Sequence, residues 1–392
     1  MNGRTVVWLI TVGTIALLGT VRAGAGGGDG VIPGAVVRTT LADAERDYEL
    51  RAAALSAGGA TTEIIMASRP KGRRPGAESL VWASVDAAGR VLSQQNPLAP
   101  LPAAEAADAS LGDPAAGSGF AFLRGRGLFL LPAAHGGLRL VRLARPNDPA
   151  AARDIDVGTA PNIRRVLASG DERLVLVGSV GAKALVTAVN AEGKTVAEHA
   201  PGAEGMTAVG ATFEADGSMV VAGEQGRFPT ATTWVGRVSP RGVILARASF
   251  AGRPADIARG SDGTYVVVVE RGGPEGSEIL LKALAPDLTE LWTRTLMSRQ
   301  RIPATFRVAP VTTGGYIIAG AKDRGLWVSR VKADGAEVWV EAHDPLTSPD
   351  LEVVSHMELA SAQDVFVTAY TAFVVNGREQ REVVRAVRFK AN

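Results

Sequence analysis

Short apolar runs, each entered through a glycine-containing turn, recur along the second half of the chain. They occupy residues 216–223, 262–269 and 314–320, where an Asp-Gly or Gly-Gly pair precedes a run rich in valine and isoleucine. Apolar positions within these runs alternate or are continuous, without the 3.6-residue period of an amphipathic helix. A turn pair followed by a β-branched run predicts a hairpin that enters a buried β-strand.

A second strand and a second turn follow each run and extend the pattern to a repeat. Three clear copies of this part cover residues 234–242, 280–288 and 327–335, and earlier copies turn at Gly89 and Gly193. The clear turns lie about 47 residues apart. Four short strands in a unit of that length are typical of one blade of a β-propeller. A solenoid of β-arches is the competing architecture, but its units are usually shorter and lack two hairpins each.

The two ends of the chain predict how the ring of blades closes. Residues 384–392 match 327–335 and stop at the turn before an outer strand, whereas residues 34–40 resemble the outer strand at 335–341. Pairing of the missing strand with the surplus one would remove the exposed sheet edges that otherwise template aggregation.

We therefore predict an all-β fold. It is a single β-propeller domain over residues 34–392, with seven four-stranded blades and the ring closed by the N-terminal strand near 34–41. Residues 96–118, rich in alanine and proline, are predicted to form a long inserted loop that could cover the channel mouth. The region 98–160 is irregular, so six or eight blades stay open as alternatives.

Two motifs carry a resemblance to known proteins. Residues 314–320 read GGYIIAG and residues 327–339 read WVSRVKADGAEVW. Together they resemble the repeats of secreted bacterial β-propeller proteins of uncharacterised function. The resemblance covers residues 160–392 well and residues 45–160 weakly. Such repeats encode turns and core positions, so the resemblance implies the fold and gives no activity.

The first 25 residues have the three parts of a secretory signal peptide. Arg4 supplies a positive start, an uncharged apolar stretch follows over residues 5–21, and small residues at 23–25 suit cleavage. A flexible glycine-rich segment at 26–33 would then lead into the propeller. A retained membrane anchor is the alternative, although this stretch lies at the short end of what spans a bilayer. We predict a periplasmic or secreted protein with no stable membrane insertion after cleavage.

Loss of that segment changes the charge of the chain. The full sequence has 42 Lys and Arg against 40 Asp and Glu, and removal of Arg4 and Arg22 leaves a neutral mature chain. A neutral surface has no general attraction to nucleic acid. The chain contains no cysteine, which excludes disulfide bonds and a lipid linked through cysteine. The fold must therefore be held by burial and sheet pairing.

In a propeller, the loops between second and third strands and those between blades share one face, and surface loops often carry binding sites. Several of these loops are basic. The candidate ligand-binding residues are Arg69, Arg73, Arg74, Arg227, Arg271 and Arg324. Convergent guanidinium groups can bind carboxylates, phosphates or sulfated sugars. Acidic residues such as Glu224 and Glu278 stand in the same loops, so ordinary solvated arginines are the alternative.

Signals for metal binding or nucleophilic catalysis are weak. The histidines His135, His199, His343 and His356 are isolated in sequence, and the Asp-Gly pairs lack the oxygen ligands of a calcium loop. We predict no metal and no cofactor. No Gly-x-Ser-x-Gly elbow and no cysteine nucleophile is present. Two tryptophan pairs, 234 with 327 and 292 with 339, hold repeat-equivalent positions, which predicts packing between blades.

The sequence favours an exported, monomeric, non-catalytic binding or scaffolding propeller that presents its loop face to a protein or an anionic ligand. No catalytic residue is predicted. The alternative is a propeller hydrolase or lyase acting on polysaccharide, since blades can bring together carboxylates that are far apart in sequence. An enzyme should place two carboxylates, or a histidine with a carboxylate, around one pocket at the channel mouth.

Overall fold

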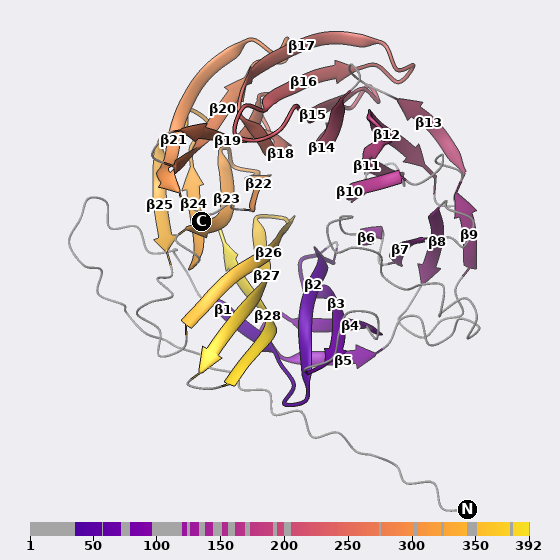
Figure 1. Cartoon of the computed structure of the whole chain (residues 1–392), viewed down its shortest axis with the longest axis vertical. Helices are drawn as coiled ribbons and strands as arrows, with labels where there is room; N and C mark the ends of the chain where they lie inside the picture. Colours follow the sequence, from indigo (N-terminus) through magenta and orange to yellow (C-terminus); the bar gives the residue numbers. More distant parts are fainter. Residues whose placement is uncertain are drawn as a thin grey trace, which may run out of the picture.

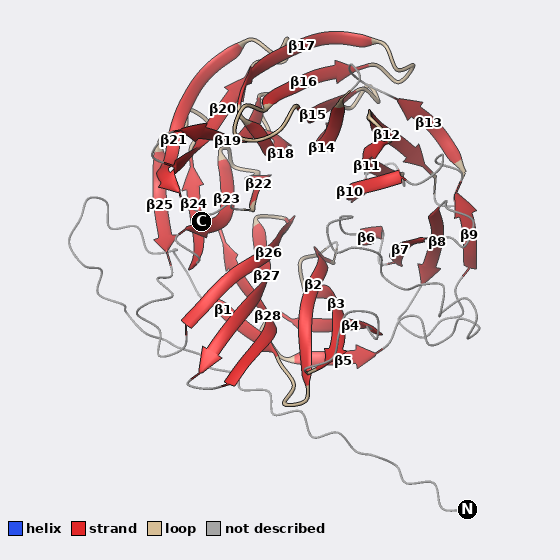
Figure 2. Ribbon diagram, in the orientation of Figure 1, coloured by secondary structure: helices blue, strands red, loops and turns tan. Residues whose placement is uncertain are grey.

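Four-stranded antiparallel sheets follow one another in a ring around a central axis, as Figure 1 shows for this computed structural model. The described part of the chain consists of strands, turns and loops, with no helix (Figure 2). The structure describes residues 36–56, 58–71, 79–95, 120–123, 126–132, 138–143, 151–155, 161–168, 173–190, 194–199, 205–273, 276–300, 305–322, 325–342, 351–376 and 379–391. The predicted all-β propeller is confirmed.

Six of the sheets each contain four consecutive strands, ordered from the axis outward. The first three are β2 (Arg46–Leu55), β3 (Thr61–Pro70), β4 (Ser79–Asp86) and β5 (Val91–Gln95); β6 (Phe120–Leu123), β7 (Arg126–Pro132), β8 (Leu138–Leu143) and β9 (Ala151–Ile155); and β10 (Pro161–Ala168), β11 (Leu174–Val180), β12 (Lys183–Val189) and β13 (Thr195–His199). The next three are β14 (Met206–Phe213), β15 (Met219–Gln225), β16 (Thr232–Val238) and β17 (Ile244–Ala251); β18 (Arg253–Arg259), β19 (Tyr265–Gly273), β20 (Gly276–Leu284) and β21 (Glu290–Gln300); and β22 (Phe306–Pro310), β23 (Tyr316–Lys322), β24 (Gly325–Val331) and β25 (Glu337–Ala342).

A further sheet joins the two ends of the chain and closes the ring. Its three C-terminal strands are β26 (Leu351–Ala362), β27 (Val365–Asn376) and β28 (Glu379–Lys390), and its fourth strand is the N-terminal β1 (Val37–Leu41). β1 pairs antiparallel with β28, from Val37 opposite Arg388 to Leu41 opposite Val384. The predicted closure by an N-terminal strand is confirmed. Because the first and last strands of the chain pair within this sheet, their hydrogen bonds close the ring.

Tight turns at the Asp-Gly pairs explain the spacing of the hairpins. Gly217 and Gly263 have φ values of +80° and +84°, a left-handed conformation in which a side chain is strained. The carboxylates of Asp216 and Asp262 accept hydrogen bonds from the backbone N–H and hydroxyl of Ser218 and of Thr264, respectively. These side chains cap turns, as the sequence predicted.

The core lies between neighbouring sheets. One cluster joins Val266 and Leu281 of one sheet with Phe306 and Trp327 of the next, all at most 3% exposed. Burying such a side chain fully contributes roughly 1.5–3 kcal/mol. The tryptophans pack between blades, as predicted. Trp327 lies in this cluster, where it also meets Phe306 of its own sheet edge-to-face. The indole N–H of Trp292 donates to the carbonyl of Ala333 in the following blade at 3.1 Å. The sheets therefore stabilise one another.

Several predictions fall on residues outside the described part of the chain. These are the signal peptide at 1–25, the glycine-rich segment at 26–33 and the inserted loop at 96–118. Within the described ranges, no helix has the length and apolar character to cross a bilayer.

Candidate functional site

The two faces of the ring carry different connections. Each innermost strand begins after a connection between blades and ends at the turn that leads to the second strand. The connections between blades therefore share one face with those between second and third strands, and we call it the loop face. The opposite face, called the turn face, carries the turns from first to second and from third to fourth strands.

The innermost strands surround the axis (Figure 1), and in five of them the pairing with the second strand shifts by one residue. Bulges of this kind re-aim side chains and are frequent beside functional sites. The residues just past the shifts are Ala52 in β2, Arg165 in β10, Gly210 in β14, Asp256 in β18 and His356 in β26.

Arg307 holds the equivalent position in β22. Arg307 pairs with Ala319, which is three residues after Tyr316. In the same way, Asp256 pairs with Val268, which is three residues after Tyr265. We call these six residues, Arg307 included, the channel ring. In β10, β14, β18 and β22 the ring residue is among the first five of its strand. The channel ring therefore lies toward the loop face, at the channel mouth.

An ion pair crosses one blade within the channel ring. Arg165 contacts the carboxylate of Asp256, which is only 2% exposed, although the strand β14 lies between their strands. Gly210 of β14 leaves the room for this contact, because a Cβ there would lie 3.3 Å from Oδ1 of Asp256. The same carboxylate accepts hydrogen bonds from the backbone N–H of Ile257 at 2.8 Å and of Val308 at 3.1 Å. Asp256 is thus engaged by one arginine and two backbone amides.

A second ion pair joins the next two innermost strands. Arg307 donates to both carboxylate oxygens of Glu358 in β26, at 3.1 and 3.2 Å. Burial alone would raise the pKa of Glu358, but the charge of Arg307, aided by Arg165 and a hydrogen bond, outweighs it and lowers the pKa to about 2. Glu358 is therefore ionised at neutral pH and fully engaged in the pair.

His356 stands beside this second pair without joining it. Its Nε2 lies 3.8 Å from Oε1 of Glu358, too far for a hydrogen bond, and has no hydrogen-bond partner among the described residues. Burial lowers its pKa; Glu358 opposes that effect, while Arg307 and Arg51 reinforce it. The imidazole is therefore neutral at pH 7.

These geometries limit the chemistry available at the channel mouth. A carboxyl group that acts as a general acid needs a raised pKa, so that it stays protonated near neutral pH. Glu358 is instead ionised and paired with Arg307, so it cannot deliver a proton. Asp256 is engaged by Arg165 and two backbone amides. Over the described ranges, no group of three or more His, Asp and Glu side chains is arranged to hold a metal ion.

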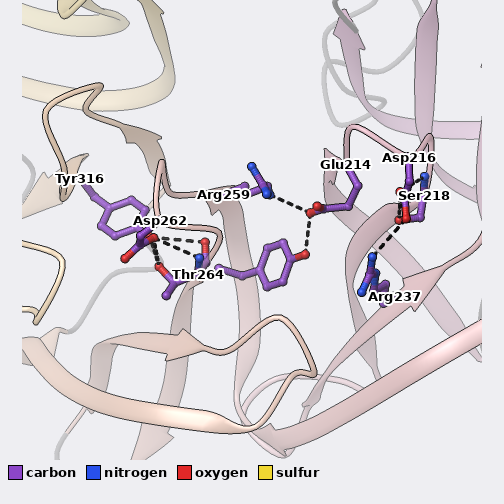
Figure 3. A network of polar contacts seen from close by, with 9 residues as sticks. Glu214, Asp216, Ser218, Arg237, Arg259, Asp262, Thr264 and Tyr316 are labelled. Atoms are coloured by element: carbon purple, nitrogen blue, oxygen red, sulfur yellow. Dashed lines mark hydrogen bonds and ion pairs between the residues drawn. The ribbon is translucent and has the colours of Figure 1, made fainter.

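The turn face carries a different polar network (Figure 3). Glu214 accepts a hydrogen bond from the hydroxyl of Tyr265 at 2.5 Å and pairs with Arg259 at 2.9 Å. In the following blade, the hydroxyl of Tyr316 lies 2.8 Å from that of Thr264. In both cases a tyrosine at the start of a second strand reaches the preceding blade's turn. The network repeats with the blades and holds neighbours together, which is a structural role.

The structure describes three of the six arginines predicted from the sequence, and each of these three lies on a different sheet or its connection. Arg69 of β3 forms an ion pair with Glu382 of β28, and Arg271 of β19 pairs with Glu278 of β20, with its Nε 3.1 Å from Oε2. Arg227 is exposed in the connection between β15 and β16. The other three, Arg73, Arg74 and Arg324, lie outside the described residues. The ligand site built from these arginines stays a prediction.

Sequence reasoning did not single out the channel ring. Its members are spaced by one blade and differ in type at equivalent positions, so no local motif marks them. A signal was present nonetheless: aligned copies of the first strand place Arg165, Asp256 and Arg307 in a column where a buried strand would ordinarily carry an apolar residue. A comparison of the blades column by column would have exposed it.

No known protein family matches the sequence, and no curated protein matches it. Solved structures match its fold. A protein from Lactobacillus plantarum is 13% identical with a TM-score of 0.52, over 81% of this chain and 94% of that chain. The WD40 domain of Toxoplasma gondii coronin is 11% identical with a TM-score of 0.52, over 92% and 88%. The polysaccharide lyase Uly1 is 9% identical with a TM-score of 0.53, over 87% and 90%.

At these identities the likeness concerns the fold alone. The matching structures include a WD40 domain and a polysaccharide lyase, and one fold commonly hosts unrelated functions. The comparisons therefore place the chain among β-propeller proteins, and its function has to be argued from its own side chains.

Proposed function

We propose that the chain is an exported, non-catalytic binding or scaffolding propeller that presents its loop face to a protein or an anionic ligand. The observation that supports this most strongly is the state of the carboxylates at the channel mouth. Asp256 and Glu358 are buried and paired with Arg165 and Arg307, respectively. Such pairs fix the innermost strands against one another and engage both carboxylates, and the lowered pKa of Glu358 does not suit a general acid.

One observation favours the second candidate, a hydrolase or lyase acting on polysaccharide. A neutral histidine, His356, stands close to a carboxylate and two arginines at the channel mouth. A lyase needs a base that removes a proton next to a carboxylate, and a neutral imidazole suits that task. Against it, Nε2 of His356 is shielded from solvent, and Glu358 is engaged by Arg307.

Two measurements test the proposal. Incubation of the full chain with a panel of neutral and acidic polysaccharides should give no shortened or unsaturated products by mass spectrometry. Product that disappears in a His356→Ala variant would establish the enzyme instead. For the anionic ligand, the joint exchange of Arg69, Arg73 and Arg74 for Ala should weaken retention on heparin resin. Unchanged retention would remove those arginines from the site.

A further inference from the structure

A group of four charged side chains and one aromatic side chain lies on the loop face, over the sheets that begin with β10, β14 and β18. We call it the rim cluster, and its members are Arg164, Glu224, Phe228, Arg253 and Glu270. Arg164 is the extra residue of the bulge in β10, and Arg253 is the first residue of β18. Glu224 and Glu270 lie near the loop-face ends of β15 and β19, and Phe228 lies in the connection that follows β15.

The connection around Phe228 is held in place by its neighbours. The backbone N–H of Thr230 donates to the carbonyl of Arg227 at 3.0 Å and closes a turn. Pro229 packs against the backbone of Gly272 in the next sheet, where an added Cβ would lie 2.4 Å from that of Pro229. Phe228 is nevertheless 36% exposed. The chain thus presents a positioned aromatic ring to solvent on its loop face.

Arg253 lies against one face of the phenyl ring of Phe228. Its Nε and a terminal nitrogen donate to the same oxygen of Glu270 at 2.8 and 2.6 Å, and its Cζ lies 5.0 Å from the ring centroid of Phe228. Glu270 is only 2% exposed. The charge of Arg253 is therefore balanced and its side chain is oriented by two contacts.

Glu224 and Arg164 differ from this pair because neither side chain forms a hydrogen bond within the described residues. Glu224 is half-buried, and burial raises its pKa against the opposing charges of Arg253 and Arg164. Arg164 is exposed and forms no ion pair in the described part of the chain. The charge of Arg164 acts on this carboxylate. A carboxylate that lacks a donor and a guanidinium that lacks an acceptor can both be completed by a ligand that carries a donor and an acceptor.

We propose that the rim cluster is a subsite for an acidic saccharide. The apolar face of a sugar ring packs on Phe228, its carboxylate or sulfate accepts hydrogen bonds from Arg164, and a hydroxyl donates to Glu224. This inference rests on the proposed binding function and names the ligand class of that face.

The chemistry of the cluster favours a saccharide over an acidic peptide. An acidic side chain would offer acceptors to Arg164 but no hydrogen-bond donor to Glu224. A uronate or sulfated sugar carries hydroxyl donors beside its anionic group, so one residue of the ligand satisfies both side chains. The flat, exposed ring of Phe228 suits a sugar face, because an aromatic ring offers large contact area at low entropic cost.

Calorimetric titration of the full chain with alginate oligosaccharides tests the inference. Phe228→Ala and Arg164→Ala should each weaken binding about tenfold, the loss expected for an aromatic contact or a charge-assisted hydrogen bond. Phe228→Tyr, which keeps the ring, should bind like the wild type. Leu245→Ala and Arg241→Ala are the matched controls, since both residues are exposed on the same sheet away from the rim cluster and should leave binding unchanged.

Each contrary outcome has a separate meaning. Wild-type affinity in both Phe228→Ala and Arg164→Ala would overturn the subsite while alginate binding itself would still support the binding function. Poly-glutamate bound as tightly as alginate would overturn the saccharide and assign the face to acidic peptides. Neutral dextran oligosaccharides bound equally well would overturn the role of Arg164. Absence of alginate binding would overturn the inference, and the binding function would then rest on heparin retention.

Discussion

The two ends of the innermost strands differ in how far they follow the repeat. At the turn face, equivalent residues do equivalent work: Tyr265 and Tyr316 each bond to the preceding blade's turn (Figure 3). At the loop face, the equivalent position holds arginine, glycine, aspartate and arginine in the successive innermost strands β10, β14, β18 and β22. A position that packing alone determines should look alike in every blade. The difference indicates that the turn face maintains the ring, whereas the loop face is where individual blades are specialised.

The largest expected effect comes from breaking a channel-mouth ion pair. Arg307→Ala leaves Glu358 buried and without its partner, which should lower the free energy of unfolding by about 3–5 kcal/mol. Urea denaturation measures this. Arg271→Ala removes an exposed pair with Glu278 and is the matched control, expected to cost about 1 kcal/mol or less. Equal small losses in both variants would contradict the structural role of the channel-mouth pair.

The ion pair between Arg307 and Glu358 also predicts that the folded protein loses stability at acidic pH. The folded-state pKa of Glu358 is about 2, below the ordinary value of 4.5. A lowered pKa contributes stability that is present above pH 4.5 and is lost as the pH falls from there toward 2. Glu358→Gln should therefore have a flatter dependence of unfolding free energy on pH across this window than the wild type. Parallel curves would show that Glu358 titrates normally in the folded chain.

A glycine in the channel ring gives an intermediate effect. Gly210→Val would introduce methyl groups where a Cβ already lies 3.3 Å from Oδ1 of Asp256 and from Ile257, so overpacking should cost roughly 1–3 kcal/mol. Gly58→Val is the control, because a Cβ there meets nothing within 4 Å. Thermal unfolding of both variants compares them. A Gly210→Val variant as stable as Gly58→Val would mean that the ion pair across β14 does not depend on Gly210.

The smallest expected losses of unfolding free energy come from the turn face, where similar tyrosine contacts recur from blade to blade. Tyr265→Phe should cost about 1.5 kcal/mol because Glu214 loses a donor but keeps Arg259, and Tyr316→Phe about 1 kcal/mol because its partner Thr264 is neutral. Neither change should alter ligand binding. A Tyr265→Phe variant that folds normally but loses binding would place function on the turn face and reverse the comparison.

The sequence predicted the architecture better than the site for a physical reason. Turns such as Asp216-Gly217 and runs such as 265–269 are local signals, repeated often enough for each copy to support the others, and even the closing strand β1 followed from comparing copies. The pairs at the channel mouth depend instead on contacts between strands far apart in the chain, such as Arg165 with Asp256. Arg69 and Arg271 attracted attention as loop arginines, yet their carboxylate partners Glu382 and Glu278 become apparent only from the strand pairing.

Hydrogen exchange of the full chain with and without alginate oligosaccharides tests the division between the two faces most directly. The account predicts slower exchange on the loop face, in the connection at 226–231 and the first residues of β18, with the turns at 214–218 and 260–264 unchanged. Slower exchange at those turns, with the loop face unaffected, would contradict it.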